Sequence, residues 1–296
     1  MKITRYIILI VISSITFMSC LSKKPSPYQL SDDIDRQLTN KWKPNQPGMA
    51  VFVWEDGKVL SENYMGKTGQ LNGQSLSSST SFRMASVSKQ FTDTAILMLE
   101  KQGKLSLNQT LAHFFPSLPS WASSITLQQL LTHTSGIVDY ESLMGDAWSG
   151  QILDEEIVPL LQNTTETYFQ PGEKFSYSNT AYCLLSLIVE QVANQSYASF
   201  MKEHLFTPLG MVDTFVYERE QANTNRALGF RKQADGSVVQ ADQSTTSATK
   251  GDGAVYTSVR DYQKWFNALR DKSLIDLEKY LTQYGYDFPE DPTQGY

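Results

Sequence analysis

The sequence predicts a globular protein of the mixed α/β class, which combines strand hairpins with a helix-rich region. Two strand-type runs, 49–54 and 58–64, are separated by Asp56-Gly57, a pair typical of tight hairpin turns. From about 105 to 246 the apolar residues recur mainly with helical spacing, interrupted by loops. A chain of 296 residues, 41% of them apolar, is long enough to bury a sizeable core.

The expected elements follow one another along the whole chain. A helix begins at Ser31, carries acidic residues in its first turns, and is ended by the Pro- and Gly-containing stretch 44–48. After the hairpin of 49–65, a Ser- and Gly-rich loop leads into an amphipathic helix at 82–100. The remaining expected elements are helices at 127–131, 152–162, 180–205 and 259–271, a second hairpin at 229–241 and a strand at 255–258.

Charge and composition exclude several classes of function. The net charge is −6 and Lys and Arg form no dense run, which argues against nucleic-acid binding. The three histidines, His113, His133 and His204, match no zinc-ligand spacing, so we expect no metal site. No nucleotide-binding glycine pattern is found, and we expect no cofactor.

Residues 1–19 have the pattern of a signal peptide. Lys2 and Arg5 give a basic start, and the apolar run that follows is shorter than the roughly 20 residues needed to span a bilayer. The run ends in Phe-Met-Ser-Cys20, which resembles a bacterial lipobox, where the cysteine is lipidated after cleavage. An ordinary cleaved signal or an uncleaved anchor is the alternative.

This leader implies export to the cell envelope, on the periplasmic or surface face of a bacterial membrane. We expect lipidation at Cys20, with residues 20–30 forming a polar tether between the membrane and a globular domain at 31–296. The lipid would make the membrane a partner of this protein. If Cys20 carries lipid, Cys183 has no partner for an internal disulfide.

Ser86 and Lys89 are the first candidates for chemistry. Positions i and i+3 of a helix share a face, so the hydroxyl and the amine can touch. A serine hydroxyl is a weak nucleophile until a base takes its proton, and a lysine in a buried, positively charged setting can be that base. Ser88 has no lysine three residues after it. The alternative is a helix N-cap serine followed by a solvated lysine.

Tyr177 and Asn179 are the second pair of candidates. They stand at i and i+2 just before a helix, so both side chains can face one side of an extended segment. A phenol beside a lysine could carry protons between nucleophile and leaving group, and the asparagine amide could hydrogen-bond a substrate amide. The alternative is a surface turn in which the asparagine caps the helix.

Several separate stretches, in the same order and at similar spacing, resemble the serine β-lactamase-like superfamily of class C β-lactamases, D-alanyl-D-alanine carboxypeptidases and penicillin-binding proteins. These stretches are 82–92, 103–107, 130–136, 171–179, 208–211 and 251–265. The resemblance covers roughly residues 40–270. It implies an antiparallel sheet flanked by helices, with a helical lobe at about 105–246.

The resemblance also assigns roles. It implies that Ser86 is the acylated nucleophile, Lys89 its base or proton relay, Tyr177 a proton shuttle and Asn179 a substrate contact. The Ser86 backbone N–H would belong to the oxyanion hole. By the same resemblance His133 is a structural landmark of the helical lobe, and no Gly-x-Ser-x-Gly turn supports a Ser-His-Asp site.

The family's third motif, Lys-[Thr/Ser]-Gly or His-x-Gly on a strand beside the nucleophile, is not found after Tyr177. Thr249-Lys250-Gly251 has the wrong order of residues. The sequence ends at Tyr296, about where family members enter that strand. We therefore expect a truncated chain whose closing C-terminal strands are missing.

The resemblance implies acyl transfer through a serine ester, with hydrolysis of an amide, lactam or ester bond. The favoured substrate is a peptidoglycan D-Ala-D-Ala-type peptide, and small β-lactams or esters use the same catalytic groups. The alternative from another class is a non-catalytic penicillin-recognising or cell-wall-binding lipoprotein, or an inactive truncated remnant. The sequence leaves the oligomeric state open.

Overall fold

The computed structural model describes residues 27–39, 46–55, 57–69, 73–145, 148–219, 225–285, 287–288 and 291–295. The helices are α1 (Pro27–Thr39), α2 (Lys89–Lys101), α3 (Leu111–Phe114), α4 (Leu127–Leu131), α5 (Tyr140–Leu143), α6 (Asp154–Gln162), α7 (Asn179–Ala193), α8 (Tyr197–Met201), α9 (Lys250–Gly253), α10 (Val259–Arg270) and α11 (Leu277–Tyr284). Two 3₁₀ turns, η1 (Ala85–Ser88) and η2 (Ser120–Ser124), and one π-helical turn, η3 (Lys202–Phe206), complete the helical segments.

The strands are β1 (Met49–Glu55), β2 (Lys58–Met65), β3 (Ser81–Arg83), β4 (Phe215–Val216), β5 (Phe230–Lys232), β6 (Val238–Gln240), β7 (Val255–Ser258), β8 (Asp287–Phe288) and β9 (Asp291–Gly295). They form four small antiparallel sheets, in the orders β1-β2, β3-β7-β4, β5-β6 and β8-β9. Helices and sheets share the chain, so the predicted mixed α/β class is confirmed.

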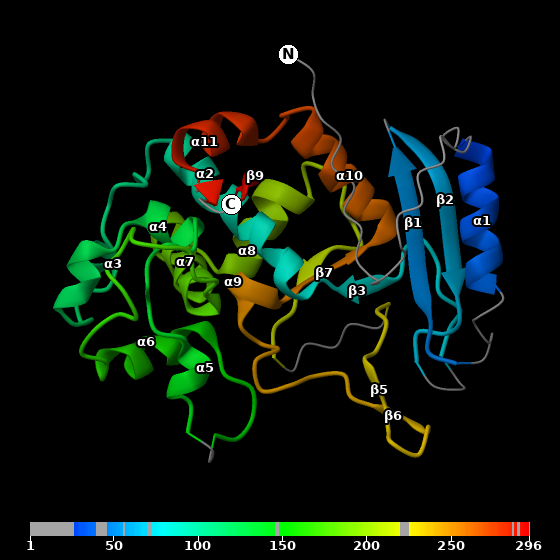
Figure 1. Ribbon diagram of the computed structural model, residues 1–296, viewed down its shortest axis with the longest axis horizontal. Coiled ribbons are helices and arrows are strands. Elements are labelled where there is room, and N and C mark those ends of the chain that lie inside the picture. The colour runs from blue at the N-terminus through cyan, green and yellow to red at the C-terminus, as the bar shows by residue number, and fades with distance from the viewer. Residues whose placement is uncertain are drawn as a thin grey trace.

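A helix-rich body fills one side of the molecule, and the β1–β2 hairpin stands at the other (Figure 1). Helix α1 covers the hairpin on the face turned away from the body, and its Asp35 carboxylate accepts hydrogen bonds from Ser61 (2.9 Å) and Asn63 (2.6 Å) of β2. On the other side, the Trp54 ring contacts the Phe266 ring of α10 edge-to-face. The hairpin is thus fixed between two helices.

The three-stranded sheet lies between the hairpin and the body. Its central strand, β7, is buried throughout and pairs with β3 and β4, which come from distant parts of the chain. Phe82 of β3 lies opposite Thr257, and Phe215 of β4 lies opposite Tyr256. Because β3 leads directly into η1 and α2, this sheet sets the position of the turn that carries Ser86.

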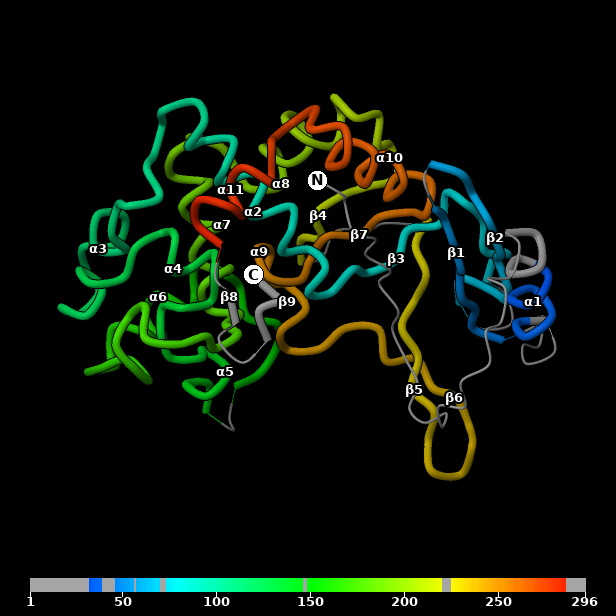
Figure 2. The backbone as a smooth tube through the Cα atoms, turned by 45° about the horizontal axis from the view of Figure 1, so that its top comes forward, coloured from blue at the N-terminus to red at the C-terminus, as the bar shows by residue number. Residues whose placement is uncertain are grey.

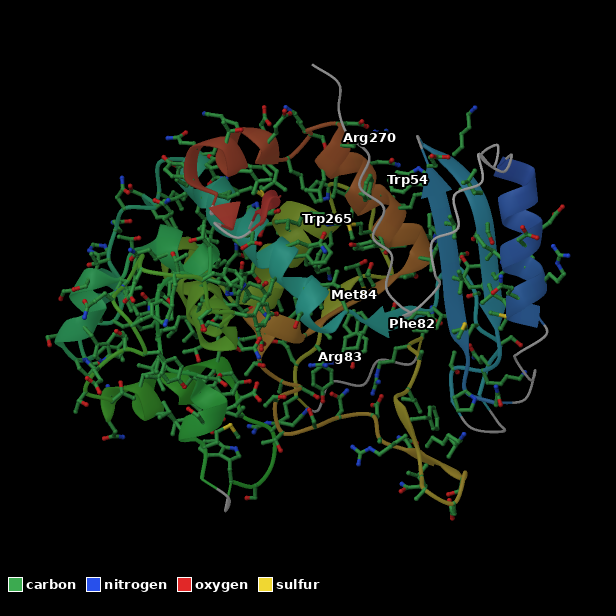
Figure 3. All side chains as sticks on the ribbon, in the orientation of Figure 1. Trp54, Phe82, Arg83, Met84, Trp265 and Arg270 are labelled. Carbon is green, nitrogen blue, oxygen red and sulfur yellow. The ribbon has the colours of Figure 1, made fainter. Side chains whose placement is uncertain are left out.

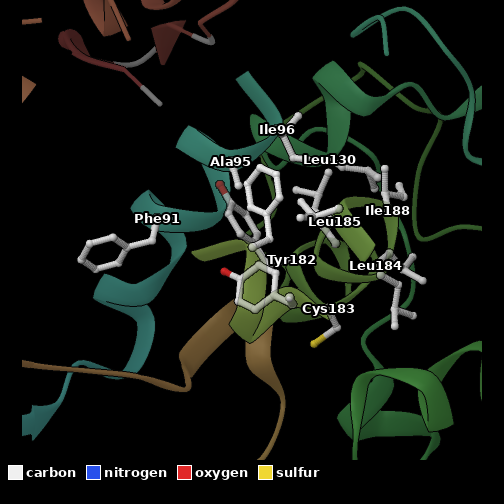
Figure 4. Close-up of a cluster of buried hydrophobic side chains, with 14 of the residues drawn as sticks. Phe91, Ala95, Ile96, Leu130, Tyr182, Cys183, Leu184, Leu185 and Ile188 are labelled. Atoms are coloured by element: carbon white, nitrogen blue, oxygen red, sulfur yellow. The ribbon is translucent and has the colours of Figure 1, made fainter. Parts of the chain in front are cut away.

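The main core is built around α7, which is buried along most of its length. A helix that is apolar around its whole circumference belongs inside a protein. Figure 4 shows Ala95 and Ile96 of α2 close to Leu185 of α7, with Leu130 of α4 beside them. Helix α2, which begins with Lys89, is therefore held by packing along its length.

Helix boundaries differ from the sequence prediction in three places. Residues 81–83 pair with β7 as a strand, so the helix expected at 82–100 begins only at Lys89. The helix expected at 180–205 ends at Ala193, because Asn194 adopts a left-handed φ of 53° and Ser196 caps a new helix. The first helix begins at Pro27 rather than Ser31, since proline fits the first turn of a helix.

The expected hairpins at 49–65 and 229–241 are confirmed, as are the strand at 255–258 and the helices near 127–131, 152–162 and 259–271. The second hairpin, β5–β6, projects away from the body (Figure 2), and residues 231–240 are all exposed. Within the described ranges, none of the helices has both the length and the apolar character needed to cross a bilayer.

Candidate active site

Ser86 lies in the exposed turn η1, between β3 and α2. Figure 3 labels Phe82 and Arg83, which belong to β3, and Met84, which lies between this strand and the turn. The residue before the serine, Ala85, has a left-handed φ of 46°, a conformation that side-chain-bearing residues seldom adopt. This sharp change of backbone direction sets Ser86 at the start of the helix and leaves it open to solvent.

One residue of β7 fixes the turn on both sides of the serine. The Met84 N–H donates to the Val255 carbonyl (2.9 Å), and the Val255 N–H donates to Ser88 Oγ (3.1 Å). The Ser88 hydroxyl is buried and acts as a structural acceptor. Ser86 and Ser88 therefore differ sharply in access to a substrate.

Lys89 is the first residue of α2 and is only 2% exposed. Its Nζ donates to Asn179 Oδ1 (2.8 Å) and to the backbone carbonyl of Asp252 (3.1 Å). The same nitrogen lies over two aromatic rings, 4.7 Å from the centroid of Tyr177 and 5.3 Å from that of Tyr182. Hydrogen bonds and ring faces thus hold this amine at a defined place.

The segment 177–179 leads into α7 and presents two side chains to Lys89. Ser178, between them, caps the helix, because its Oγ accepts from the Ala181 N–H (3.1 Å). The Asn179 Nδ2 donates to Glu141 Oε1 (3.1 Å), while its Oδ1 accepts from Lys89. The donor on one side, Lys89 Nζ, and the acceptor on the other, Glu141 Oε1, together set the orientation of the Asn179 amide.

Two carboxyl groups, of buried Asp252 and partly buried Asp93, lie close enough to Lys89 for its charge to affect their pKa. Burial raises the pKa of Asp252 to about 7, and the Lys89 charge opposes this rise. Burial also raises the pKa of Asp93 to about 7, opposed by a hydrogen bond from Tyr182 and by Lys89. Both groups therefore titrate near neutral pH in the folded protein, beside the candidate base.

The sequence interpretation did not single out Asp93, Glu141 or Asp252. Asp93 follows Lys89 by four residues on the same helix, a spacing that could have pointed to it. Glu141 and Asp252 approach the site through contacts between segments far apart in the chain. No local sequence pattern around these two residues predicts their position in the site.

The structure brings three of the predicted residues into direct contact. Lys89, Tyr177 and Asn179 meet around the lysine nitrogen, and Ser86 lies in the turn that immediately precedes Lys89. Tyr177 is 46% exposed, so one side of the group is open to solvent. The catalytic roles of these residues stay predictions, and Cys20 lies outside the described residues.

A serine at the head of a helix, one turn before a buried lysine on an α/β scaffold, is typical of serine hydrolases of the β-lactamase and penicillin-binding type. A sequence profile of the Beta-lactamase family matches residues 34–296. The chain therefore belongs to the Beta-lactamase family, and the resemblance inferred from its motifs is confirmed.

Two curated relatives match large parts of this chain. Penicillin-binding protein 4* of Bacillus subtilis (strain 168) is 35% identical over 172 residues, which are 57% of this chain and 38% of that protein. The Protein flp sequence from Staphylococcus aureus (strain MW2) is 30% identical over 244 residues, 81% of this chain and 48% of its own length. The chain thus spans less than half the length of these curated relatives.

Solved structures agree with this assignment. The octameric penicillin-binding protein homologue from Pyrococcus abyssi superposes with a TM-score of 0.73 and 27% identity, over 88% of this chain and 61% of that one. The D-amino acid amidase from Ochrobactrum anthropi SV3, in its complex with L-phenylalanine amide, gives a TM-score of 0.67 and 25% identity, over 85% and 71%.

Proposed function

We propose that this chain is an exported serine hydrolase that forms an ester at Ser86 with peptidoglycan D-Ala-D-Ala-type peptides. The observation that carries the proposal is the environment of Lys89 Nζ, which is buried directly behind the exposed serine turn and held by Asn179 and Asp252. A lysine placed only for charge on the surface would need neither acceptor.

The two acceptors suit a lysine that works as a base. A neutral amine has two N–H donors and one lone pair, and Asn179 Oδ1 and the Asp252 carbonyl account for both donors. The lone pair is then available for the hydroxyl proton of Ser86. After proton transfer, the faces of Tyr177 and Tyr182 stabilise the ammonium through cation–π contacts. Both protonation states are thus accommodated.

The chemical steps follow from this arrangement. Ser86 Oγ forms a bond to the substrate carbonyl carbon while its proton passes to Lys89 Nζ. The negative charge that develops on the carbonyl oxygen is stabilised by the Ser86 backbone N–H. The bond to the leaving group then breaks, and a proton delivered through Tyr177 neutralises that group. Water hydrolyses the ester and restores the serine.

The relatives and the site both support the proposed substrate class. Penicillin-binding relatives and a D-amino acid amidase support an amide bond next to a D-configured residue as the scissile bond. Asn179 keeps one Nδ2 hydrogen for a substrate carbonyl when the other is bound to Glu141. β-Lactams and simple esters present the same carbonyl to the same nucleophile.

Mass spectrometry tests the nucleophile. The wild-type protein incubated with a β-lactam or an activated ester should gain an adduct on the Ser86 peptide. Ser86→Ala should abolish the adduct, whereas the matched variant Ser88→Ala should keep it. Lys89→Ala should slow acylation by roughly a thousandfold or more, because base and nucleophile act as a unit. An adduct on Ser135 would refute the assignment.

The lifetime of the adduct separates an enzyme from a binding protein. Release within seconds to minutes supports hydrolysis, and a label from a fluorescent penicillin that persists for hours supports a penicillin-recognising lipoprotein.

The proposed lipidation at Cys20 has its own test. The wild type should partition with membranes, and Cys20→Ala should move it to the soluble fraction. A soluble wild-type protein would refute the anchor.

A further inference from the structure

The stretch 133–136, His-Thr-Ser-Gly, runs alongside the segment that carries Tyr177 and Asn179. Three of its carbonyls accept hydrogen bonds from amides of that segment that are four residues apart. The Tyr168 N–H donates to the Gly136 carbonyl (2.8 Å) and the Gly172 N–H to the Thr134 carbonyl (2.8 Å). The His133 carbonyl accepts from the Ser176 N–H, also at 2.8 Å. The backbone of 168–176 is thus held against this stretch by hydrogen bonds.

His133 holds the next step of the segment with its side chain. Its Nδ1 accepts from the Ser178 N–H at 3.0 Å. With its carbonyl and its ring, His133 therefore binds the amides on both sides of Tyr177. Its ring lies 4.5 Å from the Tyr177 ring and 5.0 Å from the Tyr182 ring, measured between centroids. These are the same two rings that lie below Lys89 Nζ.

The backbone at His133 is strained to make this possible. Its φ of 55° is left-handed, a conformation that glycine adopts far more readily than residues that carry a side chain. The side chain is fully buried. Burial and the nearby Lys89 charge lower the pKa of His133 to about 3, so the imidazole is neutral and Nδ1 can accept the Ser178 N–H.

We propose that His133 is a positioning residue, which fixes Tyr177 and Asn179 over Lys89 by holding the amides of Ser176 and Ser178 and packing against the Tyr177 ring. The inference rests on the proposed function of the site. The role assigned to His133 is to position other groups, not to react at Ser86 or at the scissile bond. His133 acts through Tyr177, so its removal changes the rate of the acylation step more than substrate binding.

Two substitutions that both suit a left-handed backbone test this role. His133→Gly keeps the carbonyl and relieves the strain, but it removes the acceptor and the ring. His133→Asn keeps an acceptor atom, Oδ1, at the same distance from Cβ as Nδ1. Asn194→Gly is the matched control, because Asn194 is also left-handed (φ 53°) but lies at the far end of α7.

The readout is the acylation rate constant per titrated active site, with KM, alongside the thermal midpoint. We expect His133→Gly to slow acylation about a hundredfold with KM little changed, since a misplaced catalytic group costs about that much. His133→Asn should recover about tenfold of this loss by restoring the Ser178 contact. Asn194→Gly should acylate at the wild-type rate.

If His133→Gly does not fold, the comparison of His133→Asn with His133→Leu replaces it, because leucine keeps apolar bulk without an acceptor. Faster acylation by the asparagine variant supports the proposal. Variants that lower the thermal midpoint but acylate at the wild-type rate per active site overturn it. If the wild type itself forms no adduct at Ser86, the proposed function fails instead, so the two failures are distinguishable.

Discussion

Ala85 bears the clearest local cost of building the site. A left-handed alanine is disfavoured by roughly 1–2 kcal/mol, and here it stands directly before the exposed serine. Two hydrogen bonds, which join Val255 to Met84 and to Ser88 on either side of the turn, hold Ala85 in this conformation. Strain of this kind persists at functional sites when neighbouring contacts outweigh it.

Ala85→Gly should therefore stabilise the fold while weakening the site. Glycine removes the steric strain but has more conformational freedom to lose on folding, so we expect a gain of at most about 1 kcal/mol in the free energy of unfolding. Acylation should slow, because the turn that aims Ser86 becomes looser. Denaturant unfolding and acylation kinetics measure the two effects, and a destabilised variant would contradict the assigned strain.

Asp252 makes stability depend on pH with a predictable sign. Its folded-state pKa is raised from 3.8 to about 7, so the folded protein holds this proton more tightly than the unfolded chain. Its contribution to stability is greatest below pH 4 and is lost as pH rises toward 7. Asparagine resembles the protonated acid at every pH. The Asp252→Asn variant should therefore not lose this contribution to stability as the pH rises.

The stability difference between Asp252→Asn and the wild type should thus grow from about pH 4 to 7 and level off above. The slope should not exceed about 1.4 kcal/mol per pH unit. The wild-type curve alone is a poor test, because the lowered pKa of His133 makes its contribution rise with pH between about 3 and 6.5. A difference that does not vary with pH in denaturant titrations would exclude this role for Asp252.

At this scale the sequence predicts the residues that carry recognisable spacing and misses those that do not. Ser86 and Lys89 are three apart, and Tyr177 and Asn179 are two apart, so local geometry alone suggests each pair. That Tyr177 and Asn179 belong with Lys89 came from the family resemblance, and both contact its nitrogen in the structure. The Asp252 carbonyl reaches Lys89 across 163 residues, and no local pattern encodes such a contact.

Between elements, the β1–β2 hairpin depends on its contact with α10. Trp54 and Phe266 meet edge-to-face with centroids 3.9 Å apart, and Figure 3 places Trp54 beside the end of α10 that bears Arg270. Aromatic pairs contribute about 0.5–1.5 kcal/mol beyond the area that they bury. The contact ties an otherwise two-stranded sheet to the body.

A double-mutant cycle should detect this tie. Trp54→Leu and Phe266→Leu together should cost less than the sum of the single variants, with a coupling energy of about 0.5–1.5 kcal/mol. Val238→Ala combined with Phe266→Leu is the control and should be additive, because Val238 lies on the exposed β6 strand. Denaturant unfolding supplies each value. Strict additivity of the first pair would mean that the hairpin is held by other contacts.

Element types were easier to predict than element ends. Asp56-Gly57 and Asp235-Gly236 each predict a hairpin, and both hairpins form. The helix at 82–100 was predicted too long, because the sequence of 81–83 has no feature that reveals its pairing with β7. Tertiary pairing overrode the local helical preference there. The break at Asn194 has a local cause instead: this left-handed residue ends α7, and Ser196 caps the next helix.

Across the whole molecule, burial, and with it local stability, is unevenly distributed. Helices α2 and α7 are packed in the core, whereas residues 231–240 of the second hairpin are all exposed. Regions with few buried contacts open locally at low cost and are the first to be cut by proteases. The second hairpin should therefore behave independently of the body.

Native-state trypsin digestion should cleave first at Arg231 or Lys232, both exposed on β5. The two fragments should stay together on gel filtration and separate only in denaturant, because β7 from the second fragment pairs with β3 and β4 from the first. Arg231→Gln with Lys232→Gln should remove the early cut. Initial cleavage within α2 or α7 would contradict this distribution of order.

The two bonds from Val255 that enclose the serine turn also set the order of events during folding. The bond from Val255 to Ser88 joins positions 167 residues apart, whereas the helices of the body need only near neighbours. Closing so long a loop is entropically costly, and chains rich in distant contacts fold slowly. In a refolding experiment, helical circular dichroism should return before the ability to be acylated. The turn that carries Ser86 is thus fixed by β7, a strand synthesised long after it. Reactivity of the serine therefore becomes a marker of the final stage of folding.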